Sequence, residues 1–66
     1  MTNREISDKA LEIIKLNQQY MSNQIKAQSM GYELDTIMKD MSLEDLLVLG
    51  CALTYITEQT ERTLQK

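Results

Sequence analysis

Residues 16–25, LNQQYMSNQI, hold the side chains best suited to chemistry in this chain, in a pattern that is otherwise helical. The stretch has no formal charge. Asn17 and Gln24 are seven residues apart with Tyr20 between them, so an unbroken helix places all three on one side, among apolar residues. Amides can hydrogen-bond the edge of a nucleobase, and a tyrosine ring can stack on its face. The stretch therefore suggests a polar binding surface.

Charged and aromatic residues border this stretch. Lys15 and Lys26 flank it and could bind phosphate oxygens, while Tyr32 offers a second ring for stacking. A helical wheel places both lysines on the opposite arc, so they would reach a bound anion only from a neighbouring subunit. The candidate ligand-binding residues are Tyr20, Asn17, Gln24, Lys15, Lys26 and Tyr32.

The two amides have three interpretations, which the sequence leaves open. Asn17 can pair with its own copy across a symmetric interface and so fix register and oligomer order. The second half of the helix can instead project beyond a shorter partner helix and stay in water. In the third interpretation the amides line a ligand pocket between subunits, since buried amides need hydrogen-bond partners.

Catalysis is the function class that the composition supports least. The chain has no histidine and a single cysteine, Cys51, in its most apolar run, where we expect a buried, unreactive thiol. No second thiol completes a zinc set, and no glycine-rich phosphate loop occurs. The carboxylate pairs are better explained as helix caps and surface ion pairs. We therefore expect no enzyme, no bound metal and no cofactor.

Size and charge narrow the remaining classes. A chain of 66 residues forms one domain, 1–66, and its net charge of −3 argues against binding duplex nucleic acid. The apolar run at 46–56 is shorter than the roughly 20 residues that span a bilayer. The N-terminus lacks the shape of a secretion signal, and a lone cysteine fits a reducing compartment. We expect a cytoplasmic protein.

Start and stop signals predict an all-α protein. Thr2 with Glu5, and Ser42 with Asp45, have the spacing of capping boxes, and the chain has no proline. The first helix is expected at about 3–30, ended by Gly31. A short bridging helix is expected at about 35–40, and a second long helix at about 43–64. The predicted fold is a helical hairpin with a short bridging helix.

The helix at 43–64 predicts self-association. Between Leu46 and Ile56 no arc of its surface is polar, and one helix of the same chain cannot cover it on all sides. We therefore expect a dimer or tetramer, a homo-oligomeric helical bundle, in which Gly50 permits close approach. The expected interface residues are Leu46, Leu49, Gly50, Leu53 and Ile56.

In outline the chain resembles the small all-helical proteins with which bacteriophages block host defences. The likeness rests on size, the predicted hairpin, the SLEDLLVLGCAL helix and the amides and tyrosine of 17–24. Within that group it is similar to sponge proteins that sequester cyclic dinucleotides. This resemblance implies a homo-oligomer in the host cytoplasm that removes a signalling nucleotide without cleaving it, which is immune evasion. The alternative is a protein-interaction module, an inhibitor or adaptor of a host protein, with no small-molecule ligand.

Overall fold

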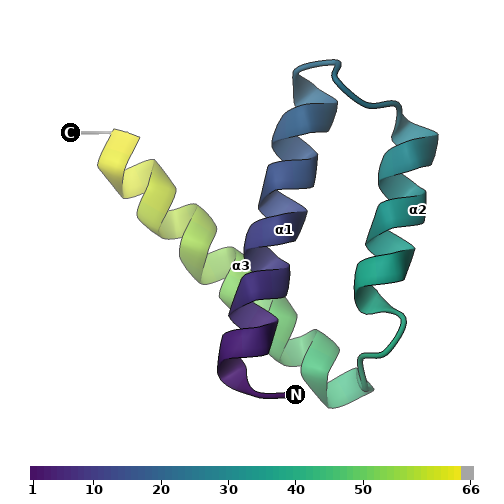
Figure 1. Cartoon of the computed structure of the whole chain (residues 1–66). Coiled ribbons are helices and arrows are strands. Elements are labelled where there is room, and N and C mark those ends of the chain that lie inside the picture. Colours follow the sequence, from purple (N-terminus) through teal and green to yellow (C-terminus); the bar gives the residue numbers. More distant parts are fainter. Residues whose placement is uncertain (65–66) are drawn as a thin grey trace.

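Three helices form the protein in a computed structural model, which describes the backbone of residues 1–64 and the side chains of residues 1–62. They are α1 (Asn3–Met21), α2 (Ala27–Met38) and α3 (Leu43–Leu64), and no strand occurs among the described residues. In Figure 1, α2 runs back alongside α1, and α3 crosses α1 at an angle. The structure confirms the all-α class, and α1 is the central helix because it packs against both others.

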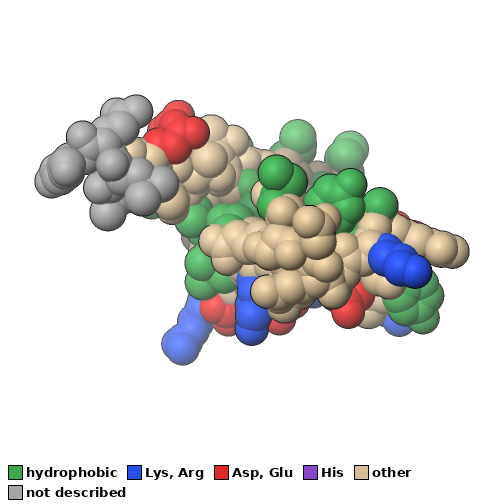
Figure 2. Space-filling view, turned by 90° about the horizontal axis from the view of Figure 1, so that it is seen from above, with side chains coloured by type: hydrophobic (Ala, Val, Ile, Leu, Met, Phe, Trp, Pro, Cys, Tyr) green, Lys and Arg blue, Asp and Glu red, His purple; other side chains and the backbone are tan. Residues whose placement is uncertain are grey.

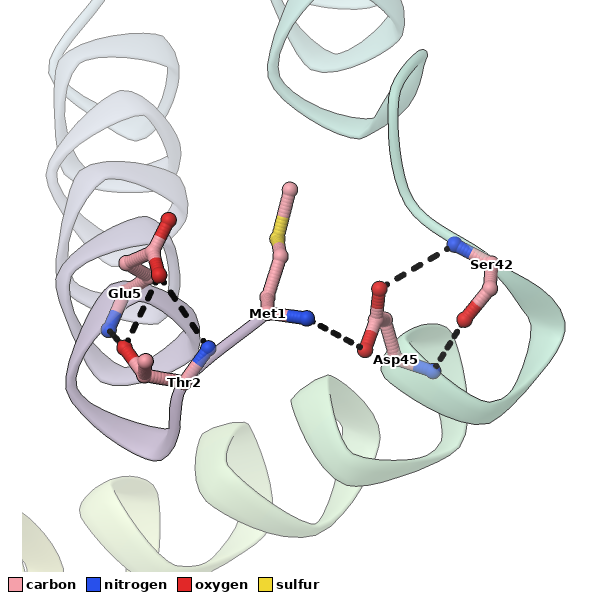
Figure 3. A network of polar contacts seen from close by, with 5 residues as sticks. All are labelled: Met1, Thr2, Glu5, Ser42 and Asp45. Carbon is pink, nitrogen blue, oxygen red and sulfur yellow. Dashed lines mark hydrogen bonds and ion pairs between the residues drawn. The ribbon is translucent and has the colours of Figure 1, made fainter.

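The caps of α1 and α3 confirm the prediction from sequence (Figure 3). The Glu5 N–H donates to Thr2 Oγ1 at 3.2 Å, and the Thr2 N–H donates to Glu5 Oε1 at 3.1 Å. At α3, the Asp45 N–H donates to Ser42 Oγ at 3.1 Å, and the Ser42 N–H donates to Asp45 Oδ2 at 3.3 Å. These bonds satisfy backbone groups that lack partners in the first helical turn.

The first helix ends at Met21, whereas the sequence pattern predicts a helix to about residue 30. Asn23 takes the left-handed conformation with φ of 61°. Its N–H donates to the Tyr20 carbonyl at 3.0 Å, and the Gln24 N–H donates to the Gln19 carbonyl at 2.8 Å. These two bonds form a Schellman motif, and asparagine tolerates its left-handed position. The break therefore lies at Asn23.

The second helix is longer than the predicted bridge at 35–40, because it begins at Ala27, directly after the break. Gly31, the expected end of the first helix, lies inside α2 and has no positive φ. The predicted two-helix hairpin is thus a three-helix arrangement, in which residues 22–26 join α1 to α2. The third helix begins at Leu43, as its cap predicts.

The core is small and lies where α1 crosses α3. Ile6 and Ala10 of α1 and Leu49 of α3 are buried against one another, and Ala10 permits close approach because its side chain is only a methyl group. Leu16 is buried farther along α1. Partly buried apolar residues surround this cluster: Ile13, Met38, Met41, Ala52, Leu53 and Ile56. So small a core leaves much of the apolar surface of α3 uncovered.

Candidate functional site

The outer face of α3, the side turned away from α1, is the most apolar exposed surface among the described residues. Three of its large members keep most of their surface in water: Leu43 is 76% exposed, Leu47 66% and Tyr55 63%. In Figure 2, hydrophobic side chains (green) stand out on the surface of the molecule. We define the outer face of α3 as Leu43, Leu47, Val48, Gly50, Cys51, Thr54 and Tyr55, all exposed.

A shallow hollow of about 590 Å³ lies on this face. Gly50 contributes to it because a Cβ built there would meet no atom within 4 Å. The Thr54 hydroxyl donates to the Gly50 carbonyl at 3.0 Å, so it turns back to its own helix. The large side chains of Leu47 and Tyr55 border these small ones. Leu47, Gly50, Cys51, Thr54, Tyr55 and Glu58 line the hollow.

The structure separates the five residues expected at the oligomer interface. Leu49 is 3% exposed and belongs to the core of its own chain, where Leu53 and Ile56 pack against it. Leu46 is 37% exposed, and Gly50 lies on the outer face. Leu49, Leu53 and Ile56, which are spaced by four and three residues and form the three-four seam of α3, therefore pack against α1. The large apolar residues that stay exposed lie on other sides of α3, and the sequence indicates them only through the absence of a polar arc.

Cys51 differs from the expectation of a buried thiol, because it is exposed and free. It lies on the side of α3 opposite Leu49, and α1 covers only the Leu49 side. Among the described residues, no group of three or more His, Cys, Asp or Glu side chains could hold a metal ion. The exposed side chains of Leu43, Leu47 and Tyr55 give the outer face its apolar character.

A second surface is the groove between α1 and α2, with a volume of about 570 Å³. Leu16 is buried in this region, and Lys15 and Tyr32 line the groove from the two helices. Glu12 and Glu33 line it as well, so acidic groups outnumber the single lysine. The complete lining is Glu12, Lys15, Leu16, Gln19, Tyr32, Glu33, Thr36 and Ile37.

Only two of the six candidate ligand-binding residues line this groove, Lys15 and Tyr32. Asn17 and Tyr20 are exposed on α1, whereas Gln24 follows the helix break, so the seven-residue relationship between the amides is lost. Lys26 is the N-cap residue of α2 and makes no side-chain capping bond. In the single chain, therefore, the predicted set does not form one pocket.

The amides also have no buried environment within one chain. No polar or charged side chain is buried among the described residues, and no buried side-chain nitrogen or oxygen there lacks a hydrogen-bond partner. Asn17 and Gln24 are both exposed and can be solvated by water. The single chain therefore provides no buried site for either amide.

Two carboxyl groups have shifted pKa values, and both belong to caps. The hydrogen bond from the Thr2 backbone N–H lowers the pKa of Glu5 below its ordinary value of 4.5. The bond from the Ser42 backbone N–H lowers the pKa of Asp45 below its ordinary 3.8. Both bonds favour the charged carboxylate, which suits a helix N-terminus. These shifts indicate structural roles for both groups.

These features define a small all-helical chain in which the rest of the described chain leaves one face of α3 uncovered. The chain matches no protein-family model, no curated protein and no solved structure. Within residues 1–64, no helix combines the length and apolarity needed to cross a membrane.

Proposed function

We propose that this protein is a non-enzymatic binding protein that assembles into a homo-oligomer through the outer face of α3. The observation that supports the proposal is the row of exposed apolar side chains, Leu43, Leu47 and Tyr55, on a helix whose opposite side is already packed against α1. Each square ångström of apolar surface removed from water contributes about 25 cal/mol. A second chain packed on the outer face of α3 would bury these apolar side chains, which the rest of the same chain leaves exposed.

The size of the core supports the same proposal. Chains below about 70–80 residues obtain little stability from one core and commonly add disulfides, metals or oligomerisation. The only cysteine is free, and the described residues offer no metal cluster. Of these three supports, oligomerisation is the one for which the chain has a surface.

Analytical ultracentrifugation tests the proposal. We expect the wild-type protein to sediment as an oligomer at micromolar concentration, and Leu47→Glu to shift it to monomer by placing a charge on the outer face. Leu11→Glu is the matched control. Leu11 is 54% exposed on α1, so the substitution makes the same chemical change on a different helix. A wild-type protein that stays monomeric at all concentrations would refute the proposal. The outer face would then be left for a different protein, as the inhibitor or adaptor alternative requires.

A second candidate function is sequestration of a small anionic ligand such as a cyclic dinucleotide. The observation that favours it is the presence of Lys15 and Tyr32 in one groove, a cation and a ring for stacking. Glu12 and Glu33 oppose anion binding there, so further positive charge would have to come from a neighbouring subunit. Sequestration therefore depends on the oligomer.

Thermal unfolding with a panel of cyclic nucleotides tests sequestration. A ligand that binds only the folded protein raises the melting temperature by mass action. We expect Lys15→Gln and Tyr32→Leu each to abolish the rise in melting temperature. Native mass spectrometry should detect the bound nucleotide at its unchanged mass. If no nucleotide in the panel raises the melting temperature, the sequestration hypothesis is wrong, whereas the homo-oligomer is unaffected.

A further inference from the structure

The exposed side of α3 carries a stripe of six residues with alternating four- and three-residue spacing. We define this α3 stripe as Glu44, Val48, Cys51, Tyr55, Glu58 and Arg62. Residues spaced in this way lie along one side of a helix and form the seam of a coiled coil. All six are exposed, and three consecutive members, Val48, Cys51 and Tyr55, are apolar. The stripe can therefore contact another helix along its whole length.

The ends of the α3 stripe carry opposite charges. Arg62 follows Glu44 by 18 residues, which is five turns of an ideal helix, so both side chains lie on the same side. Two parallel copies in register would place Glu44 on Glu44 and Arg62 on Arg62. Two antiparallel copies place each Glu44 beside the Arg62 of the other copy, which forms two attractive pairs per dimer. Charge complementarity therefore favours a second, antiparallel copy.

The centre of the α3 stripe fits the same register. With Glu44 opposite Arg62, Cys51 of one copy lies opposite Tyr55 of the other. The two-fold symmetry gives two such pairs in each dimer. The hollow beside Cys51 and Thr54 leaves room for the incoming tyrosine ring. Glu58 then lies opposite Val48, away from the Glu58 of the other copy. Antiparallel alignment also places the opposite ends of the two helix dipoles together.

We infer that the partner at the outer face of α3 is a second copy of this chain, paired antiparallel across a two-fold axis that passes between Cys51 and Tyr55 of the α3 stripe. The inference rests on the proposed function, since it presupposes that this face self-associates. It adds the orientation, the register and the residue pairs Glu44–Arg62 and Cys51–Tyr55. Such an interface is isologous, which closes the assembly as a dimer at this face.

Charge reversal tests the pairing by ultracentrifugation. We expect Glu44→Arg and Arg62→Glu each to weaken the dimer about tenfold, because each replaces two attractions by two repulsions. The double variant should restore the wild-type dissociation constant. The first variant reduces the net negative charge and the second increases it, so a general charge effect would move the two in opposite directions. Glu33→Arg on α2 is the matched control, because it makes the same change of charge away from α3 and should not weaken the dimer.

Disulfide trapping tests the register independently. In the antiparallel register, Cys51 and its own copy are offset by about 6 Å along the helix axes, in addition to the distance between the helices. Their Cα atoms then exceed the roughly 7 Å limit for a disulfide, so oxidised glutathione should not cross-link the wild-type protein. Tyr55→Cys should give a covalent dimer, and combining it with Cys51→Ala should abolish the cross-link.

The outcomes distinguish the arrangement from the proposed function. A monomeric wild-type protein refutes both. A wild-type dimer that cross-links through Cys51 alone, or whose affinity the double charge reversal fails to restore, refutes the antiparallel register and leaves the proposed homo-oligomer standing. Restoration together with a cross-link that requires both positions 51 and 55 supports the arrangement.

Discussion

The Lys9 ammonium of α1 donates a hydrogen bond to the Ile37 carbonyl oxygen of α2 at 2.8 Å. Ile37 lies in the last turn of α2, where carbonyl groups lack partners within the helix and the helix dipole favours a cation. The bond joins residues 28 positions apart and is partly buried. It therefore helps to hold α2 against α1 and shapes the groove between them.

Replacing Lys9 by methionine should destabilise the protein. The substitution keeps most of the side chain's length and apolar contact but removes the donor, and hydrogen bonds to charged groups contribute about 1.5–3 kcal/mol. Because this bond is only partly buried, we expect the free energy of unfolding in urea to fall by the lower part of that range, about 1–2 kcal/mol. Lys15→Met is the control, because no hydrogen bond or ion pair is found for Lys15 among the described residues and the lysine is exposed. Equal losses in both variants would contradict the assigned role of Lys9.

Acid should destabilise the protein through the two caps. The pKa values of Glu5 and Asp45 lie below their ordinary values of 4.5 and 3.8 in the folded chain, because each carboxylate accepts a backbone hydrogen bond. Their stabilisation is complete above those ordinary values and is lost as the pH falls through the folded-state pKa values. Urea unfolding between pH 7 and pH 2 should therefore show stability falling below about pH 4.5.

Two amide variants provide the controls for this pH dependence. Glu5→Gln keeps a capping hydrogen bond without a titrating group, and Asp45→Asn does the same at α3. The double variant should lose less stability between pH 5 and pH 2 than the wild-type protein loses. An identical pH profile for both would show that other groups control acid unfolding.

Asn23 should be the residue that ends α1. A β-branched residue at its φ of 61° is strained, so Asn23→Val should cost about 1–2 kcal/mol in the free energy of unfolding. Asn23→Gly should be close to neutral, since glycine adopts the left-handed conformation readily. Chemical denaturation measures both variants. If valine is tolerated as well as glycine, the helix does not break at this residue.

The two glycines lie inside helices and should be replaceable. Neither Gly31 in α2 nor Gly50 in α3 has a positive φ, and a Cβ at either would meet no atom within 4 Å. Gly31→Ala should raise the free energy of unfolding by about 0.8–1.0 kcal/mol, the helix-propensity difference. Gly50→Ala should match it in dilute, monomeric protein. A smaller gain for Gly50→Ala only at concentrations that favour the oligomer would place Gly50 at a close helix contact.

Much of the local structure follows from short stretches of sequence. The two capping boxes depend on residues three apart, so Thr2 with Glu5 and Ser42 with Asp45 could be read directly. The residue at which the first helix ends does not follow from the sequence alone, because Asn23 and Gly31 are both able to end a helix. The Schellman motif at Asn23 allows α2 to turn back along α1, and Lys9 then reaches Ile37. The Lys9–Ile37 contact, between residues distant in sequence, thus accompanies the helix end at Asn23 rather than one at Gly31.

The candidate site divides in the same way. Composition and periodicity alone determine that α3 is apolar on every side over residues 46–56, and therefore that α1 cannot cover it all. Only the tertiary structure decides which row α1 covers. The first helix crosses α3 where Ala10 packs against Leu49. This contact covers the three-four seam and leaves Leu47 and Tyr55 exposed. The physical reason is that apolar burial is non-directional, so periodicity alone does not select which side of α3 the crossing helix covers.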